Sequence, residues 1–136
     1  MKAIAQKDLF GCSLACIASI TGVSYDEAKK RHLTKEKLRQ LQEYGFLCKD
    51  LVGILANAGK EYSYKHLKGH ERLPYNAIVF IKRSTRYPYG HYLLKTANGW
   101  MDPWRNFEFK KARITEACAG FRKRLPGKPI YAVFPR

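Results

Sequence analysis

Long hydrophobic runs are absent from this chain. Nowhere in its 136 residues do about eighteen apolar residues follow one another, which is the length that a membrane-spanning helix needs. The first residues also lack the basic, then apolar, then small-residue order of a secretory signal peptide. We therefore expect a cytoplasmic protein without a membrane span, and secretion as an effector stays open as an alternative.

Cysteine is scarce, and the four cysteines form no CxxC pair, which argues against a disulfide framework: Cys12, Cys16, Cys48 and Cys118. An alternative zinc site would combine two of these thiols with two histidines that are also four residues apart, namely Cys12, Cys16, His66 and His70. Paired zinc ligands usually stand closer together in sequence. We therefore expect no metal and no cofactor, and regard the thiols as candidates for chemistry.

Acidic residues are also few. The chain has 11 Asp and Glu against 26 Lys and Arg, which gives a net charge of +15. From residue 69 onward, 14 basic residues stand against 4 acidic ones. Such a field attracts nucleic acid, membrane surfaces and acidic peptides, so the basic excess concerns partners and not the fold.

Internal repeats and low-complexity segments are missing as well. Hydrophobic residues make up 46% of the chain and aromatic residues 13%, which excludes a disordered protein. A chain of 136 residues can build one hydrophobic core and is too short for two comfortable ones. We expect a single domain that spans residues 1–136.

Helical signals fill the first half of the chain. The run from Cys12 to Ile20 has apolar residues on every face, with Asp8 as its expected cap and Gly22 as a left-handed stop. We predict that this helix is buried on all sides. Three further helices are predicted from Ser24 to about His32, from Thr34 to near Gly45, and over residues 50–59.

After Gly59 the segments become short, aromatic and β-branched, with Pro, Gly and Asn between them. They predict strands over residues 61–64, 77–81, 91–96, 100–102, 107–109 and 130–134. Helices followed by an antiparallel sheet define an α+β domain, in which we expect the first helix to pack on the sheet.

Four residues in this arrangement suggest thiol chemistry. The N-terminus of a helix stabilises a thiolate, and Cys12 opens the buried helix. His91, which follows Gly90 at the start of a strand, is the best proton acceptor, and Asp102 on the next strand can orient its ring. The amide of Gln6, six residues before the thiol, can join the Cys12 N–H in holding an oxyanion.

The order of these residues resembles that of papain-like cysteine peptidases, and within them the double-glycine branch that trims leader peptides from bacteriocin precursors. The segments "GILANAG", "LPYNAIVFIK", "GHYLL" and "MDP" follow in that family's order. The resemblance implies a papain-like fold, with Cys12 as the nucleophile and His91 as the general base. It further implies that Asp102 orients the ring and that Gln6 is the oxyanion donor.

The chain departs from that branch around the thiol. Members usually carry Asp before the cysteine and Gly after it, where this chain has Gly11 and Ser13. Many members are fused to a membrane exporter, which these 136 residues do not include. The choice of substrate therefore does not follow from the resemblance.

Two turns can connect the strand that begins with His91 to the strand that ends with Asp102. An Asn-Gly turn at residues 98–99 would place Asn106 opposite the histidine. The resemblance places Asp102 there instead and requires a four-residue loop at residues 95–98. We predict the longer loop, because the proline after the aspartate cannot donate to a regular strand that reaches Asn106.

A basic cluster precedes the histidine, and we expect it to line the substrate cleft: Lys82, Arg83, Arg86 and Tyr89. The cluster favours an acidic peptide or protein substrate over nucleic acid. The leading hypothesis is a papain-like hydrolase, peptidase or amidase, that forms an acyl-enzyme. The alternatives are an effector or toxin with the same chemistry, acting as protease or deamidase, and a non-catalytic basic module that binds nucleic acid or an acidic protein.

Overall fold

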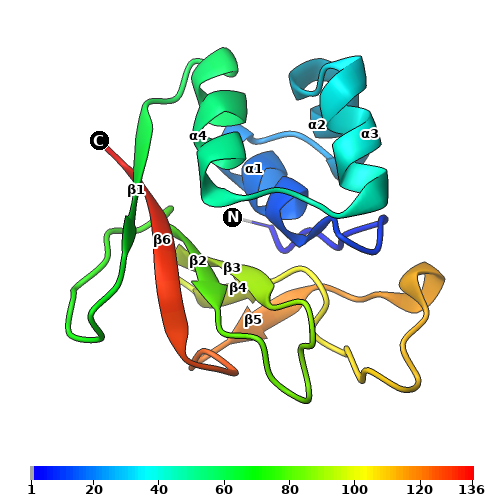
Figure 1. The fold of residues 1–136 in the computed structure, drawn as a ribbon, viewed down its shortest axis with the longest axis vertical. Coiled ribbons are helices and arrows are strands. Elements are labelled where there is room, and N and C mark those ends of the chain that lie inside the picture. Colours follow the sequence, from blue (N-terminus) through cyan, green and yellow to red (C-terminus); the bar gives the residue numbers. More distant parts are fainter. Residues whose placement is uncertain (1) are drawn as a thin grey trace.

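Within residues 2–136, which are those that the structure describes, four helices stack on one face of a six-stranded antiparallel sheet (Figure 1). The structure is a computed structural model. The helices are α1 (Cys12–Thr21), α2 (Tyr25–His32), α3 (Lys35–Glu43) and α4 (Cys48–Asn57). The predicted α+β class and the order of helices before strands are confirmed.

The sheet contains β1 (Tyr62–His66), β2 (Ile78–Ile81), β3 (His91–Thr96), β4 (Gly99–Asp102), β5 (Gly120–Arg122) and β6 (Pro129–Pro135). Their order in space is β1-β6-β2-β3-β4-β5, so the last strand lies between the first two. Strands β3, β4 and β5 are consecutive neighbours at one side of the sheet, which matters for the site described below.

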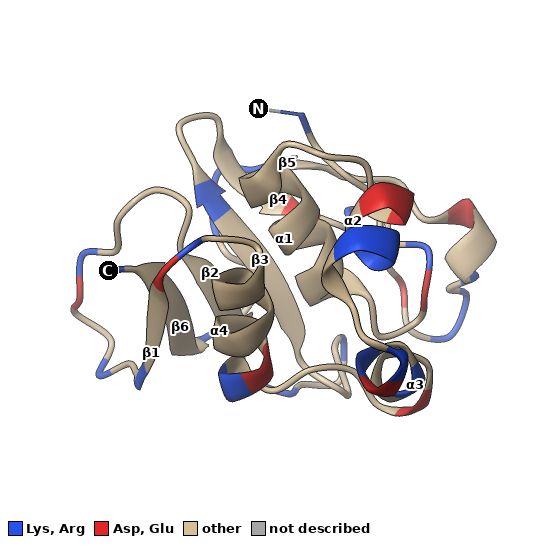
Figure 2. Ribbon diagram, turned by 90° about the horizontal axis from the view of Figure 1, so that it is seen from above, with Lys and Arg blue, Asp and Glu red and all other residues tan. Residues whose placement is uncertain are grey.

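Helix α1 is the centre of the core, as the sequence predicts. It carries no Lys, Arg, Asp or Glu, whereas α2 and α3 carry several (Figure 2). Leu14 and Ile17 are fully buried and share one apolar cluster with Ile78, Leu94 and Met101 of the sheet. The burial of apolar surface between helix and sheet thus fixes the position of the first residue of α1, Cys12.

The start of α1 differs from the prediction. The helix begins after Gly11 and has no side-chain cap, because the Asp8 carboxylate accepts hydrogen bonds from Tyr25 Oη (2.6 Å) and Lys29 Nζ (3.1 Å) instead. Gly11 is needed for this contact, since a Cβ there would lie 2.0 Å from Tyr25 Oη. The first N–H groups of α1, including that of Cys12, are therefore free of side-chain caps.

The other helices begin largely where the sequence indicates. Ser24 caps α2 and Thr34 caps α3 through their hydroxyl groups, as predicted. Helix α4 begins at Cys48, two residues early, because the Asp50 carboxylate caps it from within its first turn by accepting the N–H of Leu47. None of the helices described is both long and apolar enough to cross a membrane.

The strand predicted at residues 107–109 is wrong. This segment is a loop, and β5 lies further along at Gly120–Arg122. The aromatic residues that suggested a strand pack against other rings instead: Phe107 lies 5.4 Å from Tyr87 and 4.9 Å from Trp104, measured between ring centroids. A short run of aromatic residues is typical of a strand, but here the same pattern belongs to a loop that forms the wall of a cleft.

The hairpin between β3 and β4 follows neither expected register. Thr96 pairs with Gly99, so the turn contains two residues, and both the predicted four-residue loop and the Asn-Gly turn at residues 98–99 are wrong. The Thr96 hydroxyl stabilises this turn by donating to the Gly99 carbonyl at 2.7 Å. Asp102 consequently lies diagonally across from His91, a separation that side chains can still bridge.

Gly90 gives a test of how the start of β3 is built. It has φ +73°, and a Cβ there would lie 2.1 Å from Phe80 Cζ. Gly59 has a similar φ of +81° but no atom within 4 Å of its Cβ position. We predict that Gly59→Ala lowers the free energy of unfolding by about 1 kcal/mol, which is the cost of the left-handed backbone. Gly90→Ala should cost about 2–4 kcal/mol because overpacking adds to that cost.

Urea denaturation of the two variants beside the wild type measures this difference. Equal losses for Gly90→Ala and Gly59→Ala would contradict the close packing of Phe80 under the backbone that leads into β3.

Candidate functional site

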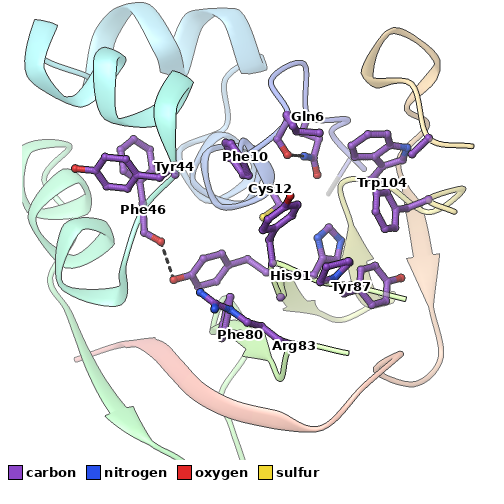
Figure 3. Close-up of a pocket in the computed structure, with 18 of the residues that line it drawn as sticks. Gln6, Phe10, Cys12, Tyr44, Phe46, Phe80, Arg83, Tyr87, His91 and Trp104 are labelled. Carbon is purple, nitrogen blue, oxygen red and sulfur yellow. Dashed lines mark hydrogen bonds between the residues drawn. The ribbon is translucent and has the colours of Figure 1, made fainter. Parts of the chain in front are cut away.

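A thiol, an imidazole and a carboxylate come together where α1 meets the sheet. Cys12 is the first residue of α1, His91 the first of β3 and Asp102 the last of β4. Cys12 and His91 line a cleft of about 500 Å³, together with Gln6 (Figure 3). The packing of α1 on β3 therefore brings together three residues that are far apart in the sequence.

The imidazole of His91 is held at its edge by Asp102. The distance from Nε2 to Asp102 Oδ1 is 2.7 Å, with the ring 5% exposed and the carboxylate fully buried. The Cys12 side chain lies beside the same ring. Asn106 lies elsewhere, since its amide binds the main chain of Glu116 and Cys118. The prediction that Asp102 and not Asn106 hydrogen-bonds the ring is confirmed, although the register that led to it was wrong.

The charges of this pair stabilise each other. Burial disfavours the charged ring of His91, but the hydrogen bonds to Asp102 and Cys12 and their negative charge outweigh it and raise the His91 pKa to about 9. Burial likewise opposes the Asp102 carboxylate, but the His91 ring and the Arg122 guanidinium hold its pKa at about 2. At neutral pH the arrangement is therefore an imidazolium against a carboxylate, beside the sulfur of Cys12.

The face of the ring is held as well. The Tyr87 ring stacks on His91 with a centroid distance of 5.0 Å and an interplanar angle of 7°. Phe107 in turn stacks on Tyr87, with a centroid distance of 5.4 Å. The imidazole is thus fixed both in its plane and perpendicular to it, which is what a proton-transferring group requires.

Gln6 lines the cleft but is engaged within its own loop. Its Nε2 donates to the carbonyl oxygens of Asp8 and Leu9, both at 3.1 Å, and its Oε1 is buried without a partner. These bonds hold the chain that leads into Cys12. An oxyanion role for Gln6 requires that one of the two bonds is exchanged for the substrate oxygen.

The walls of the cleft are aromatic to a degree that the sequence did not indicate. Ten of its lining residues are aromatic: Phe10, Tyr44, Phe46, Phe80, Tyr87, Tyr89, Tyr92, Trp104, Phe107 and Phe109. They come from the loops before α1 and after α3, from β2, β3 and the loop between them, and from the loop after β4. They line the cleft beside the thiol and the imidazole (Figure 3). Tyr89 meets Phe10 edge-on across the cleft at 5.5 Å.

The basic cluster contributes only partly to this cleft. Arg83 and Tyr89 line it, as expected, whereas Lys82 and Arg86 do not. Lys82 has an exposed side chain directly after β2, and the Arg86 guanidinium lies over the Tyr87 ring, 5.2 Å from its centroid. The expectation that all four residues form one lining is therefore wrong, because successive loop residues point in different directions.

The remaining cysteines differ from Cys12 in their surroundings. Cys16 is fully buried, and burial raises its thiol pKa well above the usual value. Cys48 is partly buried, which also raises its pKa, and Cys118 is exposed. The alternative zinc site is not formed, since no three His, Cys, Asp or Glu of residues 2–136 gather closely enough to hold a metal.

Sequence reasoning missed Arg122, whose Nε lies 2.6 Å from Asp102 Oδ2. In the sequence it begins a run of basic residues, "RKR", that is typical of a solvated surface. The signal that could have found it is chemical: an Asp predicted inside the sheet needs a buried cation, and Arg is the usual one.

Comparisons with protein-family models, with curated proteins and with solved structures found no match to this chain. The chemistry of the cleft itself is therefore the basis for assigning a function.

The reactivity of Cys12 gives the first test of this geometry. We predict that iodoacetamide alkylates Cys12 at least about tenfold faster than Cys118 at about pH 6, where ordinary thiols are almost wholly protonated. The reason is that Cys12 lies beside the positively charged His91 ring and at a helix N-terminus, whereas Cys118 has only its exposure in its favour. Peptide mass spectrometry after timed quenching measures both rates.

The control variant is His91→Asn, in which Cys12 should lose its advantage while Cys118 reacts unchanged. Equal rates at the two cysteines in the wild type would contradict the pairing of thiol and imidazole.

The buried carboxylate gives a second test, through acid stability. The pKa of Asp102 is about 2 in the folded protein against 3.8 for the ordinary group, so the folded state favours the ionised form. The resulting stability is fully present above pH 3.8 and is lost as the pH falls through 2. We predict that Asp102→Asn costs about 2 kcal/mol more unfolding free energy near pH 5 than near pH 2.

Urea unfolding of both proteins over this range measures the difference, in which the other carboxyl groups cancel. A difference that does not shrink toward low pH would show that the Asp102 charge has no stabilising partners.

Proposed function

We propose that this protein is a papain-like thiol hydrolase that cleaves amide bonds through an acyl-enzyme on Cys12. The observation that carries the proposal is a thiol at an uncapped helix N-terminus, beside a buried and ordered imidazole–carboxylate pair, in an open cleft. A thiol that served only packing would not require a neighbouring imidazole held at both its edge and its face.

In the first half of the reaction, the Cys12 sulfur attacks the carbonyl carbon of the scissile amide and forms a C–S bond. The negative charge moves to the carbonyl oxygen, where the free N–H of Cys12 and, after exchange of a hydrogen bond, the amide of Gln6 stabilise it. The His91 imidazolium then gives its proton to the leaving nitrogen as the C–N bond breaks. The products are a free amine and a thioester on Cys12.

In the second half, water attacks the thioester carbonyl carbon. Neutral His91 takes a proton from the water, the C–S bond breaks, and the acid product leaves. The proton on His91 and the thiolate on Cys12 restore the starting pair, so no external reactant besides water is consumed. Asp102 keeps the ring oriented in both halves and stabilises its charged form.

The walls of the cleft support a polypeptide segment with apolar side chains as substrate. Aromatic rings bind such side chains by burying apolar surface, and apart from His91 the charged residues that line the cleft, among those described, are Arg83 and Glu43. Because the phosphates of a nucleic acid need several cations along a groove, the cleft gives less support to nucleic acid. An acidic substrate would likewise have only Arg83 to pair with there besides the His91 imidazolium.

The assignment to papain-like cysteine peptidases, and to their double-glycine branch, remains part of this proposal. It is supported by the order of Gln6, Cys12, His91 and Asp102, and by a helix that opens with the cysteine and packs on an antiparallel sheet. An effector or toxin that cleaves or deamidates a protein would use the same residues. Its reaction differs from peptide cleavage only in which amide enters the cleft.

A degenerate peptide library tests the proposal. We predict that the wild type cleaves a subset of peptides enriched in apolar side chains near the scissile bond, as seen by mass spectrometry of the products. Cys12→Ala should abolish cleavage because no thioester can form. A mass shift without chain cleavage would identify a side-chain amide as the substrate.

The matched control is Cys118→Ala, which removes an exposed thiol outside the cleft and should cleave the same peptides at the wild-type rate. If the wild type alters no peptide, or if Cys12→Ala acts like the wild type, the proposed function is overturned.

A further inference from the structure

Arg122 is a largely buried cation bound to the carboxylate that holds His91. Its side chain is 10% exposed, and its Nε donates to Asp102 Oδ2 at 2.6 Å. The register of β5 on β4 explains this contact. Gly120 pairs with Asp102, so Arg122 lies two residues further along β5 and on the same face of the sheet. The neighbouring residues Lys123 and Arg124 are exposed.

Arg122 also reaches the residue that covers the face of the imidazole. Its Nη2 lies 3.4 Å from Tyr87 Oη and 3.2 Å from the main-chain oxygen of Arg105. Tyr87 stacks on His91, while Asp102 binds the edge of the same ring. One guanidinium thus connects the two groups that orient the imidazole, from a strand that neither of them belongs to.

The Asp102 carboxylate needs this cation because it is fully buried. Its Oδ1 accepts from His91 Nε2 and from the Trp104 N–H at 2.9 Å, and its Oδ2 accepts from Arg122. Oδ1 therefore binds the imidazole and the main chain, whereas Oδ2 binds the guanidinium. Without Arg122, the protonated His91 ring would be the sole positive charge beside the carboxylate. The buried carboxylate would then be uncompensated, at a high cost in free energy, whenever His91 gave up its proton.

We propose that Arg122 is a positioning residue of this site, which neutralises Asp102 and ties it to Tyr87 so that His91 can give up and regain its proton in a fixed orientation. This inference rests on the proposed thiol hydrolase activity and adds Arg122 to Gln6, Cys12, His91 and Asp102, the residues already assigned to it. Arg122 touches neither the thiol nor the cleft, so it acts through Asp102 and Tyr87.

The charge balance predicts the direction of the effect. With Arg122 present, Asp102 is already compensated, and His91 can be neutral when it accepts the proton of water. Removal of the cation leaves the carboxylate to retain the imidazolium more tightly, which raises the His91 pKa. The other ionisable groups near this set are Cys12 and Cys16 on α1, and Arg86 and Tyr87 before β3; all four are unchanged in the Arg122 variants described next.

The test compares Arg122→Gln, Arg122→Lys and the exposed control Arg124→Gln on a peptide that the wild type cleaves. We predict that Arg122→Gln lowers kcat about 10- to 100-fold, the scale of a lost outer-shell partner, while KM changes less than about twofold. The alkaline limb of its kcat/KM profile should move to higher pH. Arg122→Lys should keep the wild-type limb but recover only part of kcat, because an ammonium cannot make the forked contacts.

Two further measurements keep the outcome decisive. Tyr87→Phe keeps the stacked ring but removes the hydroxyl that Arg122 binds, so it should lower kcat less than Arg122→Gln does. Alkylation of Cys12 by iodoacetamide reports the thiol–imidazole pair without any substrate. If the wild type lacks selective alkylation of Cys12, the proposed function itself fails.

If the wild type shows selective alkylation but Arg122→Gln matches it in kcat and in the alkaline limb, the role of Arg122 is overturned. Full recovery of kcat by Arg122→Lys would also overturn it, since charge alone would then suffice. If Arg122→Gln does not fold, Arg122→Lys and Tyr87→Phe decide the question.

Discussion

The burial of the Asp102 carboxylate is the constraint on which the rest of the site depends. A fully buried negative charge is stable only with donors on both oxygens, and three elements supply them: β3 through His91, β5 through Arg122, and the chain after β4 through the Trp104 N–H. Because each donor is fixed by its own strand or turn, the carboxylate fixes the imidazole in return. The alignment of β3, β4 and β5 thus determines the orientation of the His91 ring.

Hydrophobic packing brings the thiol to that ring. Helix α1 has no charged residue and is buried against the sheet, so its position is set by core packing and not by the polar site. Its first turn has no side-chain cap, because Asp8 is occupied by Tyr25 and Lys29. Helix α1 therefore both stabilises the core and positions the thiol for the chemistry proposed for the cleft.

The sequence was informative where chemistry requires particular residue types in a particular order. Cys12 at a helix start, His91 after a glycine and Asp102 at a strand end could be predicted, and so could the α+β class.

The hairpin register could not be predicted, because the Thr96 hydroxyl closes the turn in a way that neither turn pattern anticipated. Arg122 and the strand that carries it were missed, since a basic run looks solvated until a buried carboxylate is known beside it. The aromatic walls were missed because their residues come from segments that meet only in the folded chain.

The central claim of this account is that Cys12 forms an acyl-enzyme, and the most direct measurement is intact-protein mass spectrometry of an acid-quenched reaction with a cleavable peptide. We predict an adduct whose mass equals the acyl part of the peptide, located on Cys12 by fragmentation and released on further incubation with water. Peptide cleavage that proceeds without any adduct on Cys12, or with the adduct on another residue, would contradict it.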